Sequence, residues 1–134
     1  MRDPYPLLLA LLLVSTAVLP AGAQPSADAG QRVFNQCRAC HVIQEGARSG
    51  VGPNLHGVWG RPAAQVEDFR YSAAMRQKAQ EGLVWTEENL RAYLANPRNV
   101  VPGGSMAFAG VRNPEQLESL LLWLRQNAGG PGAQ

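Results

Sequence analysis

The sequence predicts a small all-α domain in which several short helices are joined by long loops. Apolar residues recur at helical spacing behind capping residues, whereas glycine and proline interrupt the stretches between these segments. The alternation of strands and helices that marks a βαβ fold is missing. The run Cys-Arg-Ala-Cys-His at 37–41 also brings two thiols and an imidazole together. We therefore expect the loops to pack around a large group bound at this run rather than on one another.

The first helix is expected over residues 27–37, where Asp28 is placed to cap or begin it. Residues 44–60 contain five glycines and one proline with little periodicity, and this pattern predicts a loop. A second helix is expected over 71–80, because these residues favour helix and Ser72 can act as the N-cap.

The remaining helices are marked by their first turns. Thr86 begins a capping pattern, and Pro97 stops the helix that follows it. Residues 100–113 are too interrupted by glycine and proline to be regular. Pro114 suits the first turn of the last helix, along which leucines recur at helical spacing, namely Leu117, Leu120, Leu121 and Leu124. The glycine-rich residues 128–134 are expected to form a frayed, flexible tail.

The beginning of the chain has the pattern of an export signal. Residues 7–19 are an almost unbroken apolar run, too short to be a comfortable membrane span, and small residues of the A-x-A kind follow it. We interpret 1–23 as a secretory signal peptide and 24–134 as a single domain located in the periplasm. Arg2 is followed by Asp3, so the start supplies little positive charge, and an uncleaved membrane tether is the alternative.

Composition argues against a nucleic-acid-binding protein. The chain of 134 residues has 12 Lys+Arg against 10 Asp+Glu, and its basic residues are scattered rather than gathered in a block. A domain of this size buries a modest fraction of its surface. A large apolar cofactor at its centre would therefore supply much of the missing core.

Residues 37–41 are what covalent haem attachment requires. Cys37 and Cys40 can each add to one vinyl group of the porphyrin, which leaves the imidazole of His41 where it can bind the iron. A thioredoxin-like redox pair would need a βαβ fold, and a disulfide across so short a span would stabilise little. Zinc would need four ligands, and only His56 is left to complete such a set. We therefore expect one covalent haem c per chain.

The second axial position of the iron has three candidate ligands, since Met1 would leave with the signal. Met106 lies in an irregular segment that can bring a thioether inward from the far side of the ring. Met75 lies in an Ala-rich helical stretch, where a methionine is more often core filler. His56 is close in sequence to His41, and a lone histidine is more often a hydrogen-bonded structural residue.

Further motifs follow the haem-binding run in a fixed order. They are Gly52-Pro53-Asn54-Leu55-His56-Gly57, Gly60-Arg61, Phe69-Arg70-Tyr71-Ser72, Trp85, Tyr93-Leu94-Ala95-Asn96-Pro97 and Val101-Pro102-Gly103 leading to Met106-Ala107-Phe108. In this ordered set, from about Gly30 to Leu124, the chain resembles class I cytochrome c. The branch it resembles is the mitochondrial-like one that includes soluble cytochromes of purple bacteria. The resemblance implies the small all-α cytochrome c fold around one covalent haem.

The resemblance also implies that His41 and Met106 are the two axial ligands. The carbonyl of Pro53 would accept a hydrogen bond from the free ring nitrogen of His41, which fixes the tautomer. Tyr93 matches a residue that hydrogen-bonds the methionine sulfur.

Other positions match residues that surround the haem. Arg61, Tyr71 and Trp85 match residues that contact the buried propionates, whose carboxylates need hydrogen-bond donors. Phe108 matches an aromatic residue that shields the haem edge. Four further residues match positions that form the contact between the first and last helices, namely Gly30, Phe34, Leu120 and Trp123.

Lysine is scarce where relatives carry it around the haem edge. Gln36, Asn99 and Ser105 stand at positions that are often lysine in relatives, which argues against strongly acidic docking partners. We expect a monomer that meets its redox partners by transient, salt-sensitive docking at the exposed haem edge.

With both axial positions filled and no acid–base constellation elsewhere, the expected function is one-electron transfer rather than catalysis. A thioether favours ferrous iron, so we expect a positive reduction potential. Two alternatives stay open: a haem subunit of a periplasmic dehydrogenase, and a haem enzyme or ligand binder in which Met106 is labile beside Gly104.

Overall fold

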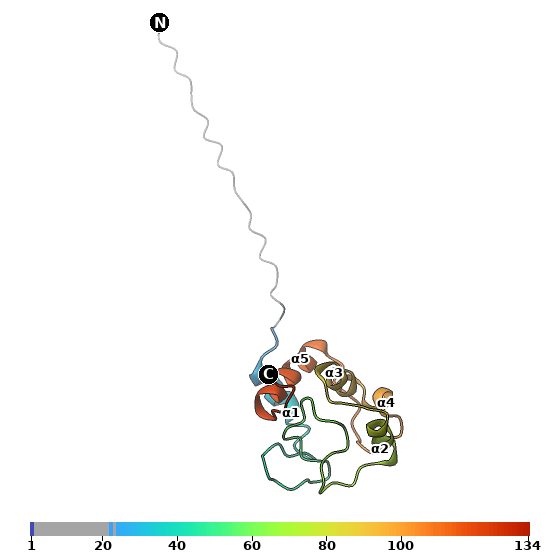
Figure 1. Ribbon diagram of the computed structural model, residues 1–134. Helices are drawn as coiled ribbons and strands as arrows, with labels where there is room; N and C mark the ends of the chain where they lie inside the picture. Colours follow the sequence, from blue (N-terminus) through green and yellow to red (C-terminus); the bar gives the residue numbers. More distant parts are fainter. Residues whose placement is uncertain (2–21, 23) are drawn as a thin grey trace.

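Figure 1 shows the computed structural model of the chain, which describes residues 1, 22 and 24–134. The predicted signal peptide lies outside this part except for residues 1 and 22. Among the described residues there are five helices, α1 Ala27–Phe34, α2 Ala73–Gln80, α3 Glu87–Ala95, α4 Pro97–Val100 and α5 Pro114–Asn127. None of these helices combines the length and the apolar character needed to cross a bilayer.

The prediction of an all-α fold is confirmed. Long irregular segments join the helices, and the one β-type pairing in the described part of the chain is an antiparallel bridge between Pro62 and Val84. Helix α1 packs against α5, and α3 packs against both α4 and α5. The long loop between α1 and α2 lies below this group of helices in Figure 1.

Helix α1 is capped and ended differently from the prediction. Its N-cap is Ser26, whose hydroxyl accepts a hydrogen bond from the Ala29 amide at 3.2 Å, while Asp28 lies in the first turn. The helix stops at Phe34, and residues 35–40 form turns. In these turns the Cys37 amide donates to the Phe34 carbonyl at 2.8 Å. The haem-binding run therefore begins in a turn rather than in the last turn of a helix.

The other helix starts agree with the sequence. Ser72 accepts a hydrogen bond from the Met75 amide at 3.1 Å, and Thr86 accepts one from the Asn89 amide at 3.2 Å. Pro114 occupies the first turn of α5 behind an Asn113 N-cap. Pro97 follows the end of α3 as predicted and also opens the short helix α4.

The contact between α1 and α5 forms part of the core. The rings of Phe34 and Trp123 stack with centroids 4.3 Å apart. Gly30 faces α5 so closely that a Cβ there would stand 2.0 Å from the Ser119 carbonyl oxygen. This is the helix contact that the resemblance implies.

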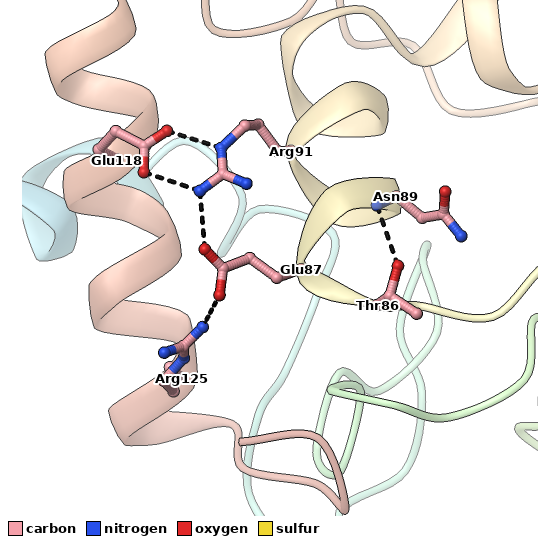
Figure 2. A network of polar contacts seen from close by, with 6 residues as sticks. All are labelled: Thr86, Glu87, Asn89, Arg91, Glu118 and Arg125. Atoms are coloured by element: carbon pink, nitrogen blue, oxygen red, sulfur yellow. Dashed lines mark hydrogen bonds and ion pairs between the residues drawn. The ribbon is translucent and has the colours of Figure 1, made fainter. Parts of the chain in front are cut away.

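Four charged side chains join α3 to α5 (Figure 2). Arg91 donates to both carboxylate oxygens of Glu118, at 2.8 and 3.0 Å, and to Glu87 at 2.8 Å. Arg125 donates to the other oxygen of Glu87. Hydrogen bonds from Arg91 hold the pKa values of Glu87 and Glu118 below their ordinary value. The network ties the two helices together at their exposed side.

We expect Glu87→Gln to lower the free energy of unfolding by ~0.5–1 kcal/mol at neutral pH, because these ion pairs are partly exposed and screened. The folded-state pKa of Glu87 is lowered, so its contribution is complete above the ordinary pKa and is lost as pH falls through the lowered one. Urea unfolding of the haem-loaded protein measures the difference. A difference that persisted in molar salt, or after the pH had fallen below the lowered pKa, would contradict this account.

The end of the chain differs from the predicted frayed tail. Residues 128–133, which we call the C-terminal strap, lie against the loop of residues 57–60. The amides of Gly57 and Trp59 donate to the strap, and the Gly132 amide donates back to the Trp59 carbonyl at 2.9 Å. Glycine makes this contact possible because it lets two backbones approach closely. Composition alone predicts fraying and does not reveal the loop that receives the strap.

Candidate haem site

A cavity of about 310 Å³ is enclosed by residues of α1, α2, α3 and α5 and of the loops between them. All ten residues that were predicted for the haem site line it, namely Cys37, Cys40, His41, Pro53, Arg61, Tyr71, Trp85, Tyr93, Met106 and Phe108. Chain segments far apart in sequence thus contribute to one site.

Most of the remaining wall is apolar. Phe34, Leu90, Leu120 and Leu124 line the cavity, although helical spacing identified such residues only as core. Phe69 also lines it and packs edge-on against Tyr71, with ring centroids 4.9 Å apart. Spacing cannot distinguish a side chain that packs on a cofactor from one that packs on a neighbour, which is why these residues were missed as site residues.

The lining fits a large, mainly apolar group that carries a few acceptors. The Nε atom of Arg61 is buried and has no hydrogen-bond partner in the described part of the chain. Buried donors in native proteins are nearly always paired, so this one is left for an acceptor on the bound group. A porphyrin with carboxylate substituents satisfies both the apolar wall and this donor.

The ring of His41 is held from two sides. Its Nδ1 lies 2.7 Å from the Pro53 carbonyl oxygen, which fixes Nδ1 as the donor and leaves Nε2 free to bind a metal. Gly52 is buried against the ring, and a Cβ at this position would stand 2.4 Å from Cε1 of His41. His56, by contrast, is exposed and is not among the residues that line the cavity.

Buried Asn54 organises the loop behind His41. Its side-chain amide donates to the carbonyls of Gln44 and Ala47, both at 2.8 Å, and its Oδ1 accepts from the His56 amide at 2.8 Å. Asn54 is part of the motif that carries the resemblance, but it was not selected as a site residue. The signal that could have found it is an amide side chain beside Pro53, inside a loop with no regular backbone pairing.

A second contact joins this loop to the segment before α2. The Asp68 carboxylate accepts from the Ser49 amide at 2.8 Å and from its hydroxyl at 2.6 Å, while the Ser49 hydroxyl accepts from the Asn54 amide at 3.0 Å. The Ser49 hydrogen bonds hold the pKa of Asp68 below its ordinary value. The local sequence around Asp68 and Ser49 does not predict this long-range pair.

The polar part of the wall consists of Arg61, Tyr71 and Trp85. Arg61 donates to the His56 carbonyl at 2.7 Å and to the Asn54 carbonyl at 3.3 Å. Burial lowers the pKa of Arg61 and raises that of Tyr71, and each of the two groups partly offsets the shift of the other. Backbone hydrogen bonds of 2.9 Å connect Trp85 to Gly60 and to Arg61. Arg61 and Trp85 thus come from two segments that are paired directly, while Tyr71 comes from the segment just before α2.

Another part of the cavity wall contains Tyr93, Met75, Met106 and Phe108. Burial raises the pKa of the Tyr93 hydroxyl to about 12, so this group stays a neutral donor. Its ring lies against Trp85 with centroids 4.9 Å apart. Met106 comes from an irregular segment and Met75 from α2, and both line the cavity. The cavity therefore offers two thioethers.

The two cysteines are free thiols rather than a disulfide. Cys37 is partly buried, and burial, together with the neighbouring Cys40 thiol, raises its pKa to about 11. Cys40 is exposed. Since no disulfide joins them, both thiols can bond to a group held in the cavity that they line.

Two thiols and an oriented imidazole opening into a large apolar cavity define a protein of the c-type haem class. No family model matches the chain. The chain is similar to the cytochrome c2 of Afifella marina, at 45% identity over 97 residues that cover 72% of this chain and 78% of that protein. It is also similar to the cytochrome c2 of Blastochloris viridis, at 40% identity over 125 residues that cover 92% and 95%.

A solved structure agrees with these relatives. Cytochrome cH from Methylobacterium extorquens matches with a TM-score of 0.68 and 33% identity, over 75% of this chain and 98% of that one. The chain belongs to the class I c-type cytochromes, in the branch of mitochondrial cytochrome c and the cytochromes c2. It carries one covalent haem c and is an electron-transfer protein that works with redox partners rather than an enzyme.

Proposed function

We propose that the chain is a periplasmic one-electron carrier in which His41 and Met106 are the axial ligands of the haem iron. The main support for this proposal is that the predicted ligands and both cysteines line one cavity. His41, held 2.7 Å from the Pro53 carbonyl, lines the same cavity as Met106 and both cysteines. Met106 is preferred over Met75 because its segment is irregular and can adapt to a metal, whereas Met75 is fixed in the first turn of α2.

The ligand pair determines whether ferrous or ferric iron is favoured. The haem supplies a reversible change between ferrous and ferric iron. A thioether is a poor donor to ferric iron, so Met106 raises the reduction potential relative to a second histidine. The apolar wall acts in the same direction, because ferric haem would carry one more positive charge into a medium of low dielectric constant. With His41 and Met106 both holding the iron, substrates would have no access to it.

The polar wall holds the acidic edge of the cofactor. Arg61, Tyr71 and Trp85 would donate hydrogen bonds to the propionates and compensate for the cost of burying them. Tyr93, neutral because of its raised pKa, would donate to the sulfur of Met106. Phe108 would cover the haem edge, and Cys37 and Cys40 would hold the group through thioether bonds.

Partners are proposed to dock at the rim of the cavity. The exposed residues that line it are all uncharged, namely Gln36, Cys40, Val51, Gly104, Ser105 and Ala107. Val51 is a large apolar residue and is 79% exposed. Small, transient contacts suit such a rim. Any salt dependence of docking must then come from charges outside this rim. We also propose that the carrier is a monomer.

We also propose that residues 1–23 are removed on export and that 24–134 form the periplasmic domain. Residues 24 and 25 are exposed and precede the Ser26 cap of α1, so cleavage before them leaves the fold intact. The alignment with the Blastochloris viridis relative covers 92% of this chain, so it extends into the segment before residue 24. That relative therefore has a comparable N-terminal segment.

A redox titration followed by absorption, on protein released from the periplasm, tests the proposal. We expect thioether-linked haem, a methionine–iron charge-transfer band in the ferric state and a midpoint potential well above zero. A midpoint near or below zero would overturn the ligand assignment, as would loss of the band at neutral pH. Co-purification with a dehydrogenase would identify a bound subunit instead of a free carrier.

A further inference from the structure

The C-terminal strap, residues 128–133, is bonded to the 57–60 loop in both directions. The Gly57 amide donates to the Ala128 carbonyl at 2.7 Å and the Trp59 amide to the Gly129 carbonyl at 3.1 Å, while the Gly132 amide donates to the Trp59 carbonyl at 2.9 Å. Ala128 and Trp59 are each only 1% exposed. The strap is therefore part of the packed structure rather than a loose end.

The contact between the strap and the loop requires glycine at position 130. A Cβ at Gly130 would stand 2.4 Å from the Trp59 carbonyl oxygen and 2.7 Å from that of Gly57. Gly130 also has φ of 130°, a conformation that other residues rarely adopt. The guanidinium of Arg125, at the end of α5, lies 4.7 Å from the centroid of the Trp59 ring. The end of α5 and the strap thus hold the 57–60 loop together.

This loop leads directly to the polar wall of the cavity. Arg61 follows it in sequence, and the Gly60 amide donates to the Trp85 carbonyl at 2.9 Å while the Trp85 amide donates to the Arg61 carbonyl at 2.9 Å. The loop is therefore fixed between the strap and the backbone of Trp85. A shift of the loop would move Arg61, whose buried Nε is left for a group in the cavity.

We propose that the C-terminal strap is a positioning element that fixes Arg61 and thereby raises the reduction potential of the carrier. The inference rests on the proposed function of Arg61 in the polar wall. A fixed guanidinium cation near the haem disfavours the extra positive charge of ferric iron. When the loop is released, the cation moves towards water, where its field is screened, and ferric iron becomes easier to form.

Gly130→Ala in the haem-loaded protein tests the proposal against Gly129→Asn. A Cβ at Gly129 meets nothing within 4 Å, and its φ of 66° lies where asparagine is tolerated. In Gly130→Ala we expect amide exchange at Gly57 and Trp59 to accelerate by about tenfold. We also expect the ratio of reduced to oxidised protein at a fixed potential to fall about threefold, a shift of ~28 mV at ~59 mV per tenfold. Gly129→Asn should change neither quantity.

Two further variants separate positioning from general stability. In an Arg61→Gln background, Gly130→Ala should still accelerate exchange but should shift the midpoint no further. A chain that ends at Ala128 with an amidated C-terminus puts neither a Cβ nor a new charge against the loop, so it serves if Gly130→Ala does not take up haem, and the same shift is expected. Faster exchange with an unmoved midpoint, or an undiminished shift without Arg61, would overturn the proposal. Since each comparison is between variants, failure of the proposed ligand assignment would appear separately, in the wild-type midpoint.

Discussion

Met106→Ala is expected to abolish the methionine–iron band of the ferric protein and to lower its midpoint potential by on the order of 100 mV or more. The thioether stabilises ferrous over ferric iron, and water or hydroxide in its place would reverse that preference. Absorption and voltammetry of the purified holoprotein measure both effects. Covalent haem should be retained, since both cysteines and His41 are untouched.

Met75→Leu is the matched control for this prediction. Both methionines line the cavity, so both substitutions remove a thioether from it. Leucine has a volume close to that of methionine, and such swaps usually cost under ~1.5 kcal/mol. The band and the midpoint should survive in Met75→Leu. If the band were lost in this variant and kept in Met106→Ala, the ligand would be Met75.

Gly52→Ala should damage the opposite side of the site. Its Cβ would stand 2.4 Å from Cε1 of His41 and 2.8 Å from both ring nitrogens. The ring or the loop must shift, and overpacking of this kind costs ~1–3 kcal/mol. We expect a fall in the unfolding free energy of that size, together with a reduced yield of haem-loaded protein. Thermal unfolding and a haemochrome assay measure the two losses.

Gly46→Asn is the control for Gly52→Ala. Gly46 belongs to the same loop between α1 and α2, has φ of 70°, and a Cβ there meets nothing within 4 Å. This substitution should leave haem yield and stability close to wild type. Equal losses in both variants would show that the loop tolerates no change. The losses in Gly52→Ala could then not be attributed to its specific contact with His41.

Local signals predicted most of the helix starts. Ser72, Thr86 and Pro114 act through the first turn of their own helices, so neighbouring residues were enough to find them. At α1 two capping residues lie close together, and local sequence could not rank Ser26 above Asp28. The structure shows a tertiary reason, since the Ser26 amide also donates to the buried Ser119 hydroxyl at 3.2 Å.

The motif order predicted residues that line one cavity, whereas it could not predict the contacts between loops that surround this cavity. The motif order led to every residue of the predicted set, and the structure gathers them around one cavity. The Asp68–Ser49 pair and the contact of the strap with the 57–60 loop join residues far apart in sequence. Periodicity and composition report on neighbours along the chain, so they cannot reveal such pairs.

The proton spectrum of the reduced holoprotein identifies the methionine that binds the iron. The methyl group of a coordinating methionine lies over the porphyrin, whose ring current shifts its resonance far upfield. We expect one such resonance, which is retained in Met75→Leu and absent from Met106→Ala. An upfield methyl that disappeared in Met75→Leu, or no upfield methyl in the wild type, would contradict the assignment of His41 and Met106 as the axial pair.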